Sequence, residues 1–538
     1  MFRGLLATLA LAACGSSTSL PVEARCNPLG AGACLAPWPS SAFEIDDPTT
    51  VTGRRLAIPE DAIPRGASDE AIDPARWNAL DGFVPTTPII VELPGGVASA
   101  DLPAADNMDL SLAADSPTVI LDLTTGQRVA HHAEIDDDSQ ALILHPAARL
   151  AFGHRYAVAL TSRLVAADGS ELPLTPGFRA LVNDRRTDHP LLEAMRSRID
   201  EVLDALDEAD VVDDLVLAWD FTVASESSLR SDVVAARDRA RATLATYPSL
   251  HTITQDTTVR GTRKISGTLD GPLFLSNGGE PRANTRLVRD DAGLPAVQGL
   301  YRIPFAAVVP PCARPMPVAI WGHASWREAS AALDEPAVAL AKELCAVVIA
   351  TDLRGRSEAD VPAVKRAIAD LASADELDAI VQGIVDHATL IVALDSIFGR
   401  TIDPARLFYV GDHLAIAALP ELRRAGIIDG RSSRHAPFSA DYLRYDAIDA
   451  LLVRTLIEAR WDRVLPARFG HPVLVQAGHD EPASWLARTF GLPIVDPPRT
   501  PWGVRTARGP LPGSGVVFDE RPTLREFFTT GQIRPAPM

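Results

Sequence analysis

The sequence has 538 residues, enough for about three or four domains, and its composition of 47% hydrophobic and 22% charged residues is typical of a globular protein. It carries 51 basic and 70 acidic residues, a net charge of −19, and it has no run of Lys and Arg, so we expect no nucleic-acid partner. No stretch reaches the roughly 18 uninterrupted apolar residues that a membrane-spanning helix needs.

The N-terminus has the pattern of a bacterial lipoprotein signal. Arg3 precedes an apolar core that ends in Leu-Ala-Ala-Cys14, and a short polar tether follows. Cys14 is then the lipidated first residue of the mature protein; an ordinary secretory signal, cleaved elsewhere, is the alternative. Gly15, rather than Asp, after the cysteine favours the outer membrane. We therefore expect a bacterial cell-envelope lipoprotein that contacts the membrane through its lipid anchor.

Four further cysteines divide into two pairs. Cys26 and Cys34 have a spacing that suits a small disulfide loop in an oxidising compartment. Cys312 and Cys345 lie in apolar surroundings, where they either pair or remain buried thiols.

The first half of the chain predicts a β-rich domain with helices. Residues 25 to about 85 are rich in Pro, Asp and turn signals. Expected strands follow at 87–93, 117–123, 141–146 and 155–161, with the spacing of a β-sandwich. Amphipathic helices are expected at 189–206 and 227–246, and hairpins over 252–300. His131-His132 is interpreted as a polar strand pair and not as a metal site.

After residue 300 the pattern changes to apolar strands that alternate with helices. The expected strands are 316–323, 345–352, 407–410, 472–478 and 515–518. Continuous apolar strands of this kind predict a parallel sheet with both faces covered by helices.

Several stretches resemble the α/β-hydrolase family, and more closely bacterial secreted lipase-like proteins with a β-sandwich domain ahead of the hydrolase domain. They are CNPLGAGACLAPWPSSAF, IWGHASW, ATDLRGRSEADV, YVGDHLA and LARTFGLPIV. The resemblance implies a mostly parallel α/β-hydrolase-like sheet after an Ig-like β-rich domain. It divides the chain into a signal and tether (1–24), a β-rich domain with helices (25–250), a hairpin connector (251–300) and a hydrolase-like domain (301–538).

The resemblance also locates a catalytic triad, which is degenerate here. Gly322, His323 and Ala324 match the oxyanion loop, with Ala where Gly is usual. At the nucleophile elbow, His413 stands where Ser is expected. Asp480 is the candidate for the acid loop, and no histidine follows His479 in the sequence.

Two functions follow from this pattern. The first is a catalytically silent module with a binding or structural role, for which an acyl- or ester-type small molecule is the candidate ligand. The alternative is an active esterase or lipase-like hydrolase that uses other residues. Ser357, in GRSEA, is interpreted as part of a turn and not as a nucleophile. His323, His413 and His479 each follow an expected strand, but their spacing is no metal signature, so we expect neither metal nor cofactor.

Overall fold

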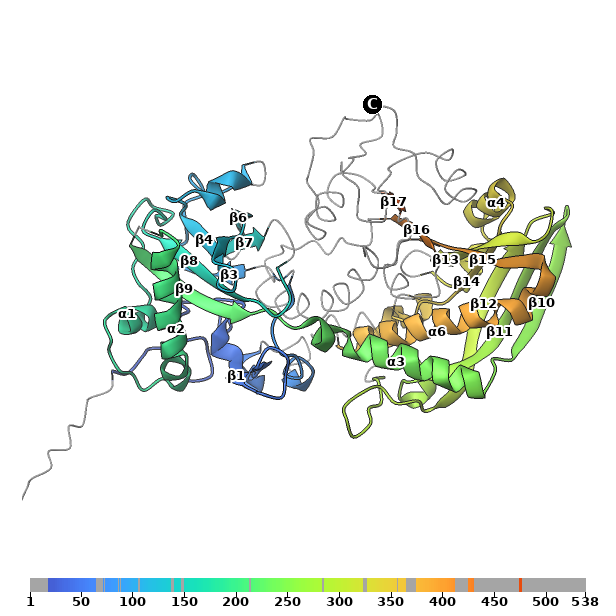
Figure 1. Ribbon diagram of the computed structural model, residues 1–538, viewed down its shortest axis with the longest axis horizontal. Coiled ribbons are helices and arrows are strands. Elements are labelled where there is room, and N and C mark those ends of the chain that lie inside the picture. Colours follow the sequence, from blue (N-terminus) through green and yellow to red (C-terminus); the bar gives the residue numbers. More distant parts are fainter. Residues whose placement is uncertain are drawn as a thin grey trace, which may run out of the picture.

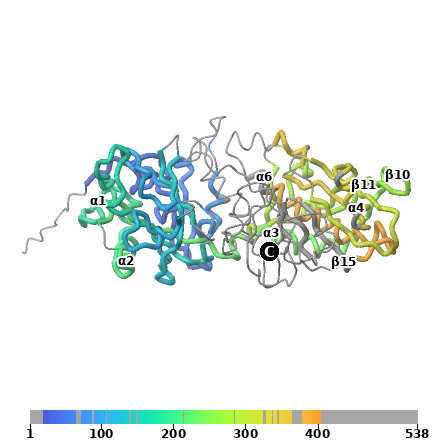
Figure 2. Tube along the Cα trace, turned by 90° about the horizontal axis from the view of Figure 1, so that it is seen from above, coloured from blue at the N-terminus to red at the C-terminus, as the bar shows by residue number. Residues whose placement is uncertain are grey.

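The computed structural model describes residues 18–411 apart from short gaps, together with two strands at 424–429 and 474–476. The gaps are 64–70, 72, 86, 88, 105–106, 137–139, 147–149, 212–213, 283–284, 323–326, 356 and 364–373. Two lobes lie along the long axis of the molecule, and both views separate them (Figures 1 and 2). Helix α3 (Glu226–Thr246) leads from the first lobe into the second.

The first lobe contains two antiparallel sheets, a hairpin and two helices. One sheet has the order β3 (Ile89–Val91), β7 (Leu142–Pro146), β6 (His131–Ile135). The other has the order β5 (Gln127–Arg128), β4 (Thr118–Asp122), β8 (Arg155–Thr161), β9 (Leu215–Thr222). The hairpin joins β1 (Glu44–Asp46) to β2 (Arg54–Leu56), and the helices are α1 (Pro176–Val182) and α2 (Pro190–Glu208). Its largest fully buried side chains are Trp38, Phe43, Phe83, Phe178, Trp219 and Phe221.

The described part of the second lobe is built on one sheet of eight strands. Their order is β10 (His251–Val259), β11 (Thr262–Leu273), β12 (Gly299–Val309), β14 (Val347–Thr351), β13 (Met316–Gly322), β15 (Ile402–Gly411), β16 (Arg424–Asp429), β17 (Leu474–Gln476). The pairs from β14 to β17 are parallel, whereas β10, β11, β12 and β14 pair antiparallel. The sheet is therefore mixed: four of its seven strand pairs are parallel and three are antiparallel. Segment 251–300, expected to be a hairpin connector, supplies β10 and β11 to this sheet.

Helices cover both faces of the sheet. Val318 and Ile349 point to the face covered by α6 (Ala374–Phe398), and they share one apolar cluster with Ile384. Ala319 and Val348 point the other way, into a cluster made almost wholly of Ala and Val. That face is covered by α4 (Glu335–Leu344), which has Pro336 in its first turn, where the missing N–H has no helical partner to lose. Because both faces of the sheet are buried, the sequences of these strands are continuous apolar runs.

Helix α6 is a core helix of this lobe. By length and composition alone, its segment Asp378–Thr401 could cross a membrane. However, 72% of the most apolar 18-residue stretch in this segment is buried inside the protein. The helix packs against α3 and the sheet (Figure 1). Its hydrophobicity is therefore explained by the protein core.

Two disulfides are formed among the described residues. Cys26 and Cys34 are bonded, with their Cα atoms 4.5 Å apart, which confirms the pair expected from their spacing. Cys312 and Cys345 are also bonded, with their Cα atoms 5.6 Å apart, so the alternative of two buried thiols is wrong. The second disulfide joins the loop after β12 to the turn between α4 and β14.

Candidate functional site

The strand order of the second lobe defines one place where a ligand is expected. From β13 the chain crosses through α4 to β14 on one side, and then returns through α6, past β13, to β15 on the other side. In open α/β sheets, ligands bind outside the carboxyl ends of the strands at such a switch point. Here the switch point lies between the ends of β13 and β15, where Gly322 is paired with Gly411.

This pairing brings together two motifs that are almost ninety positions apart in the sequence. Gly322 ends the strand of the expected oxyanion loop, and Gly411 ends the strand of the expected nucleophile elbow. The residues that would react lie beyond these glycines. His323, Ala324, His413 and Asp480, as well as Cys14, are outside the described residues, and so is the group of His323, His413 and His479.

The loop that follows Gly322 is anchored by the turn after β14. Asp352, directly after that strand, accepts a hydrogen bond from the backbone N–H of Ala329 at 2.6 Å. The N–H of Glu358 donates to the carbonyl of Arg327 at 3.3 Å. Burial raises the pKa of Asp352, and the Ala329 N–H opposes that effect. The far end of the loop is thus attached to the 352–358 turn, while Gly322 holds the near end in the sheet.

Ser357 belongs to that turn and is not available as a nucleophile. The residue is 1% exposed, and its Oγ donates to Oδ2 of Asp360 at 2.5 Å. The same oxygen accepts from the N–H groups of Gly355 at 2.7 Å and Ser357 at 3.1 Å. Asp360 and Ser357 form a capping box at the start of a short 3-10 helix, Glu358–Asp360. The geometry agrees with the interpretation of GRSEA as a structural turn.

A buried network of polar side chains, which the sequence did not predict, connects β12 to α6. Tyr301 of β12 donates its hydroxyl hydrogen to Asp386 of α6, and Nε2 of Gln382 donates to the other carboxylate oxygen at 2.8 Å. Burial raises the pKa of Asp386 to about 7, although both hydrogen bonds and the charge of Arg354 act to lower it. The carboxyl group therefore titrates near neutral pH inside the lobe.

A signal for this network was present in the sequence of α6. Asp378, Gln382 and Asp386 are spaced four residues apart among apolar residues of this helix, and all three are buried. Asp378 accepts from the N–H of Leu287 at 3.0 Å, and Gln382 accepts from the N–H of Phe274 at 2.8 Å. A polar stripe at helical spacing inside a core helix has to find partners, because unpaired buried polar groups are costly.

A second buried cluster, in the first lobe, is structural. Glu44 and Asp220 have fully buried side chains, and Arg198 contacts both carboxylates. The two oxygens of Glu44 accept from the N–H and the hydroxyl of Thr222, at 2.6 and 2.8 Å. Burial raises the pKa of Glu44, and Arg198 acts to lower it. These carboxylates already have their full set of partners, so the cluster offers no position for a ligand.

Comparisons with known proteins do not assign the chain to a family. No family model matches the sequence, and no curated protein does. Solved structures to which it is similar include acetyl xylan esterase 1 from Thermoanaerobacterium sp. (15% identity, TM-score 0.31, 48% of this chain and 82% of that one). They also include an acetyl xylan esterase from Paenibacillus sp. (14% identity, TM-score 0.30, 53% and 86%) and an S-formylglutathione hydrolase from Agrobacterium tumefaciens (14% identity, TM-score 0.27, 52% and 95%). At these identities and TM-scores the similarity carries no argument about activity.

Proposed function

We propose that this protein is a lipid-anchored protein of the bacterial cell envelope, on the outer membrane, whose second lobe is an α/β-hydrolase fold with a degenerate catalytic triad. It binds an acyl- or ester-type small molecule and does not hydrolyse it. The proposal includes an Ig-like sandwich in the first lobe and a signal and tether over residues 1–24. It rests most on one observation, the pairing of Gly322 with Gly411 at the switch point of the sheet.

The chemistry beyond these two glycines supports binding without hydrolysis. In the elbow pattern, the nucleophile stands two residues after the first glycine, and that residue is His413. Acyl transfer also needs a base close to the nucleophile, and residues 480–538 contain no histidine. By contrast, the oxyanion-loop segment is anchored at both of its ends, at Gly322 and at Arg327 and Ala329. A loop held in this way can present backbone N–H groups to a carbonyl oxygen.

The proposal is tested with the full-length protein in detergent. We expect no hydrolysis of p-nitrophenyl acetate or butyrate above the buffer rate, and no labelling by a fluorophosphonate probe. Binding of p-nitrophenyl butyrate should raise the melting temperature, and His413→Trp should abolish that rise because it fills the elbow position. Val51→Ser, at a 75% exposed position of the other lobe, is the control that should keep it. Turnover or labelling would instead establish the active esterase.

Restoring the serine alone should not restore catalysis. General-base assistance is worth about 10²- to 10⁴-fold, so His413→Ser without a base should stay near the background rate. A burst of p-nitrophenol from this single variant would reveal a functional base and contradict the degenerate triad.

A further inference from the structure

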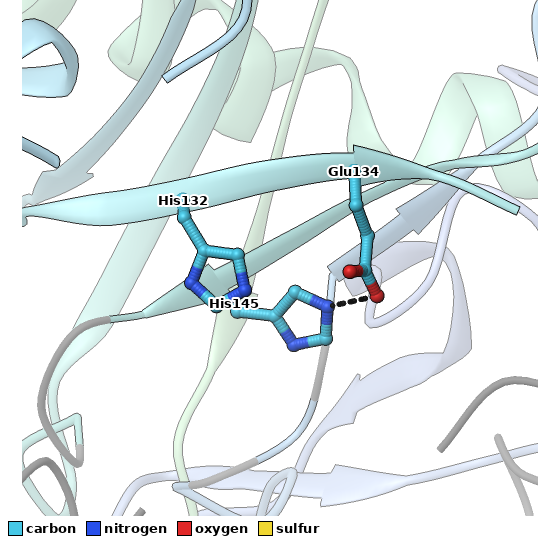
Figure 3. A group of neighbouring side chains, drawn as sticks. All are labelled: His132, Glu134 and His145. Atoms are coloured by element: carbon cyan, nitrogen blue, oxygen red, sulfur yellow. Dashed lines mark hydrogen bonds and ion pairs between the residues drawn. The ribbon is translucent and has the colours of Figure 1, made fainter. Parts of the chain in front are cut away.

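A group of three potential metal ligands lies in the first lobe, far from the switch point in the fold. It consists of His132 and Glu134 of β6 and His145 of β7 (Figure 3). One ligand atom from each side chain can be chosen so that all three lie within 4.8 Å of one another. Among the described residues, no other group of three His, Cys, Asp or Glu side chains has its ligand atoms this close together.

The antiparallel register explains why these side chains meet. His132 and Glu134 are two residues apart on one strand, so they project from the same face of the sheet. His145 lies directly opposite His132 in the ladder. His132, Glu134 and His145 therefore project from one face of the sheet, and the backbone hydrogen bonds between β6 and β7 fix their relative positions.

The three side chains already interact. Nε2 of His145 lies 2.9 Å from Oε1 of Glu134. The rings of His132 and His145 are stacked, with centroids 4.5 Å apart and planes 17° from parallel. The side chain of His145 is 16% exposed and that of Glu134 is 39% exposed, so the group lies at the surface but is partly shielded.

His131, the residue before His132 on β6, has a purely structural role and serves as a comparison. His131 points to the opposite face and is fully buried. Both of its ring nitrogens have partners, at 2.8 Å to Oγ1 of Thr118 and at 2.9 Å to the carbonyl of Val129. Burial lowers the pKa of His131 to about 4, which keeps the ring neutral. His132 and His145 instead face each other and a carboxylate at the surface.

The donor set suits zinc. Zn²⁺ binds His nitrogen and Glu oxygen at about 2.0–2.2 Å, so ligand atoms in a tetrahedral site are about 3.4 Å apart. The widest separation, up to 4.8 Å, has to shorten by about 1.4 Å, and one ring has to tilt out of the stack, to reach that geometry. Two His and one carboxylate leave a fourth position for water, as in open zinc sites.

We propose that His132, Glu134 and His145 bind one zinc ion, with water as the fourth ligand. The ion replaces the hydrogen bond between His145 and Glu134 and ties edge strand β6 to β7. The disulfide cysteines do not compete for it, because Cys26, Cys34, Cys312 and Cys345 are bonded in pairs.

Zinc binding is measured on the full-length protein in detergent, without a polyhistidine tag and after treatment with a chelator. Metal analysis after equilibration with micromolar zinc should give one ion per chain. Competition with a chromophoric chelator should show affinity at least tenfold lower for His132→Ala, His145→Ala and Glu134→Gln. His154→Gln is the matched control: His154 also pairs with a carboxylate, that of Asp122 at 2.9 Å, but belongs to no such group of three within the described part of the chain.

Two readouts separate loss of the site from loss of the fold. Glu134→Gln is nearly isosteric and should keep the wild-type circular dichroism spectrum, yet zinc should no longer raise its melting temperature. Cobalt in place of zinc should give visible absorption bands of tetrahedral coordination in the wild type and in His154→Gln only. Less than stoichiometric zinc in the wild type would overturn the proposal. Unchanged affinity in the three ligand variants would do the same, since the ion would then lie elsewhere.

Discussion

Gly383, in the middle of α6, lies at a contact that leaves no room for a Cβ atom. A Cβ atom built on Gly383 would lie 2.8 Å from the backbone nitrogen of Arg354 and 2.8 Å from Cδ1 of Leu353. Gly383 therefore allows the helix to approach the turn after β14 that anchors the Gly322 loop. Helix propensity acts in the opposite direction, because Ala is favoured over Gly by about 1 kcal/mol in a helix interior.

We expect Gly383→Ala to destabilise the protein. Overpacking of a tight contact costs about 1–3 kcal/mol, which outweighs the gain in propensity because one of the two atoms belongs to the backbone and cannot rotate away. Urea unfolding should show a lower midpoint. Val392→Ala, on the same helix at a 50% exposed position, is the control and should change stability by no more than about 0.5 kcal/mol. A Gly383→Ala protein as stable as the wild type would mean that the helix can move away from the turn.

The buried carboxyl group of Asp386 should make stability depend on pH. Burial raises its pKa from 3.8 to about 7 in the folded protein, so the folded state holds this proton more tightly than the unfolded chain does. Its contribution to stability is therefore complete below pH 3.8 and is lost as the pH rises toward 7. Asp386→Asn removes that titration; its amide oxygen can accept from Nε2 of Gln382, and its NH2 can donate to the hydroxyl oxygen of Tyr301, which then changes from donor to acceptor.

Urea midpoints of the wild type and Asp386→Asn between about pH 5 and pH 8 test this linkage. The variant should gain stability relative to the wild type as the pH rises. Asp256→Asn is the control. A hydrogen bond from Arg263 lowers the pKa of Asp256, so this carboxylate does not titrate in that range and the substitution should change the urea midpoint by the same amount at every pH. A difference between the wild type and Asp386→Asn that does not change with pH would show that Asp386 is ionised throughout.

At the scale of elements, the second lobe depends on connections between neighbouring strands that are distant in sequence. The disulfide from Cys312 to Cys345 closes a loop of 33 residues that contains β13 and α4. The disulfide from Cys26 to Cys34 closes a loop of 8 residues in the first lobe. A longer loop loses more entropy in the unfolded chain when it is closed, so the two bonds should differ in their effect.

Removal of the longer crosslink should be the more destabilising change. The loop-entropy relation gives about 3–4 kcal/mol for Cys312→Ser with Cys345→Ser, against about 2–3 kcal/mol for Cys26→Ser with Cys34→Ser. Urea unfolding of the two double variants compares them directly. Alkylation of the unreduced, denatured protein followed by mass spectrometry should find none of these four thiols free. Modified Cys345 in that experiment would contradict the bond.

At the scale of the whole molecule, the proposed anchor is close to the folded protein. The N–H of Thr18 donates to the carbonyl of Arg186 at 2.9 Å, and that of Leu20 donates to Asp188 at 3.3 Å. Only three residues lie between Cys14 and Thr18, so the four Cα–Cα steps span at most about 14 Å in an extended chain. If Cys14 is lipidated, the first lobe lies at the membrane surface rather than at the end of a long tether.

Cys14→Ser should release the protein from membranes. Each buried CH₂ of an acyl chain contributes about 0.8 kcal/mol, and two or more chains make anchoring durable. Fractionation after a carbonate wash should place the wild type in the membrane pellet and the variant in the supernatant. Cys34→Ser, which removes a different cysteine, is the control and should remain in the pellet. A variant that stays with the membrane would place the anchor elsewhere.

The sequence by itself determined the elements whose burial is regular. The strands expected at 117–123, 155–161 and 316–323 are Thr118–Asp122, Arg155–Thr161 and Met316–Gly322. The helices expected at 189–206 and 227–246 are Pro190–Glu208 and Glu226–Thr246. Periodicity suffices here because each face of an element meets either the core or water along its whole length.

Only the tertiary structure decided which of these elements meet. It placed β10 and β11 in the large sheet, paired Cys312 with Cys345, and set Gly322 beside Gly411. It also brought His145 opposite His132 and joined Tyr301 to Asp386, contacts that the sequence analysis did not anticipate. Local patterns report how an element is buried but not which element buries it. Partner choice depends on register and crossover direction, which are properties of the packed chain.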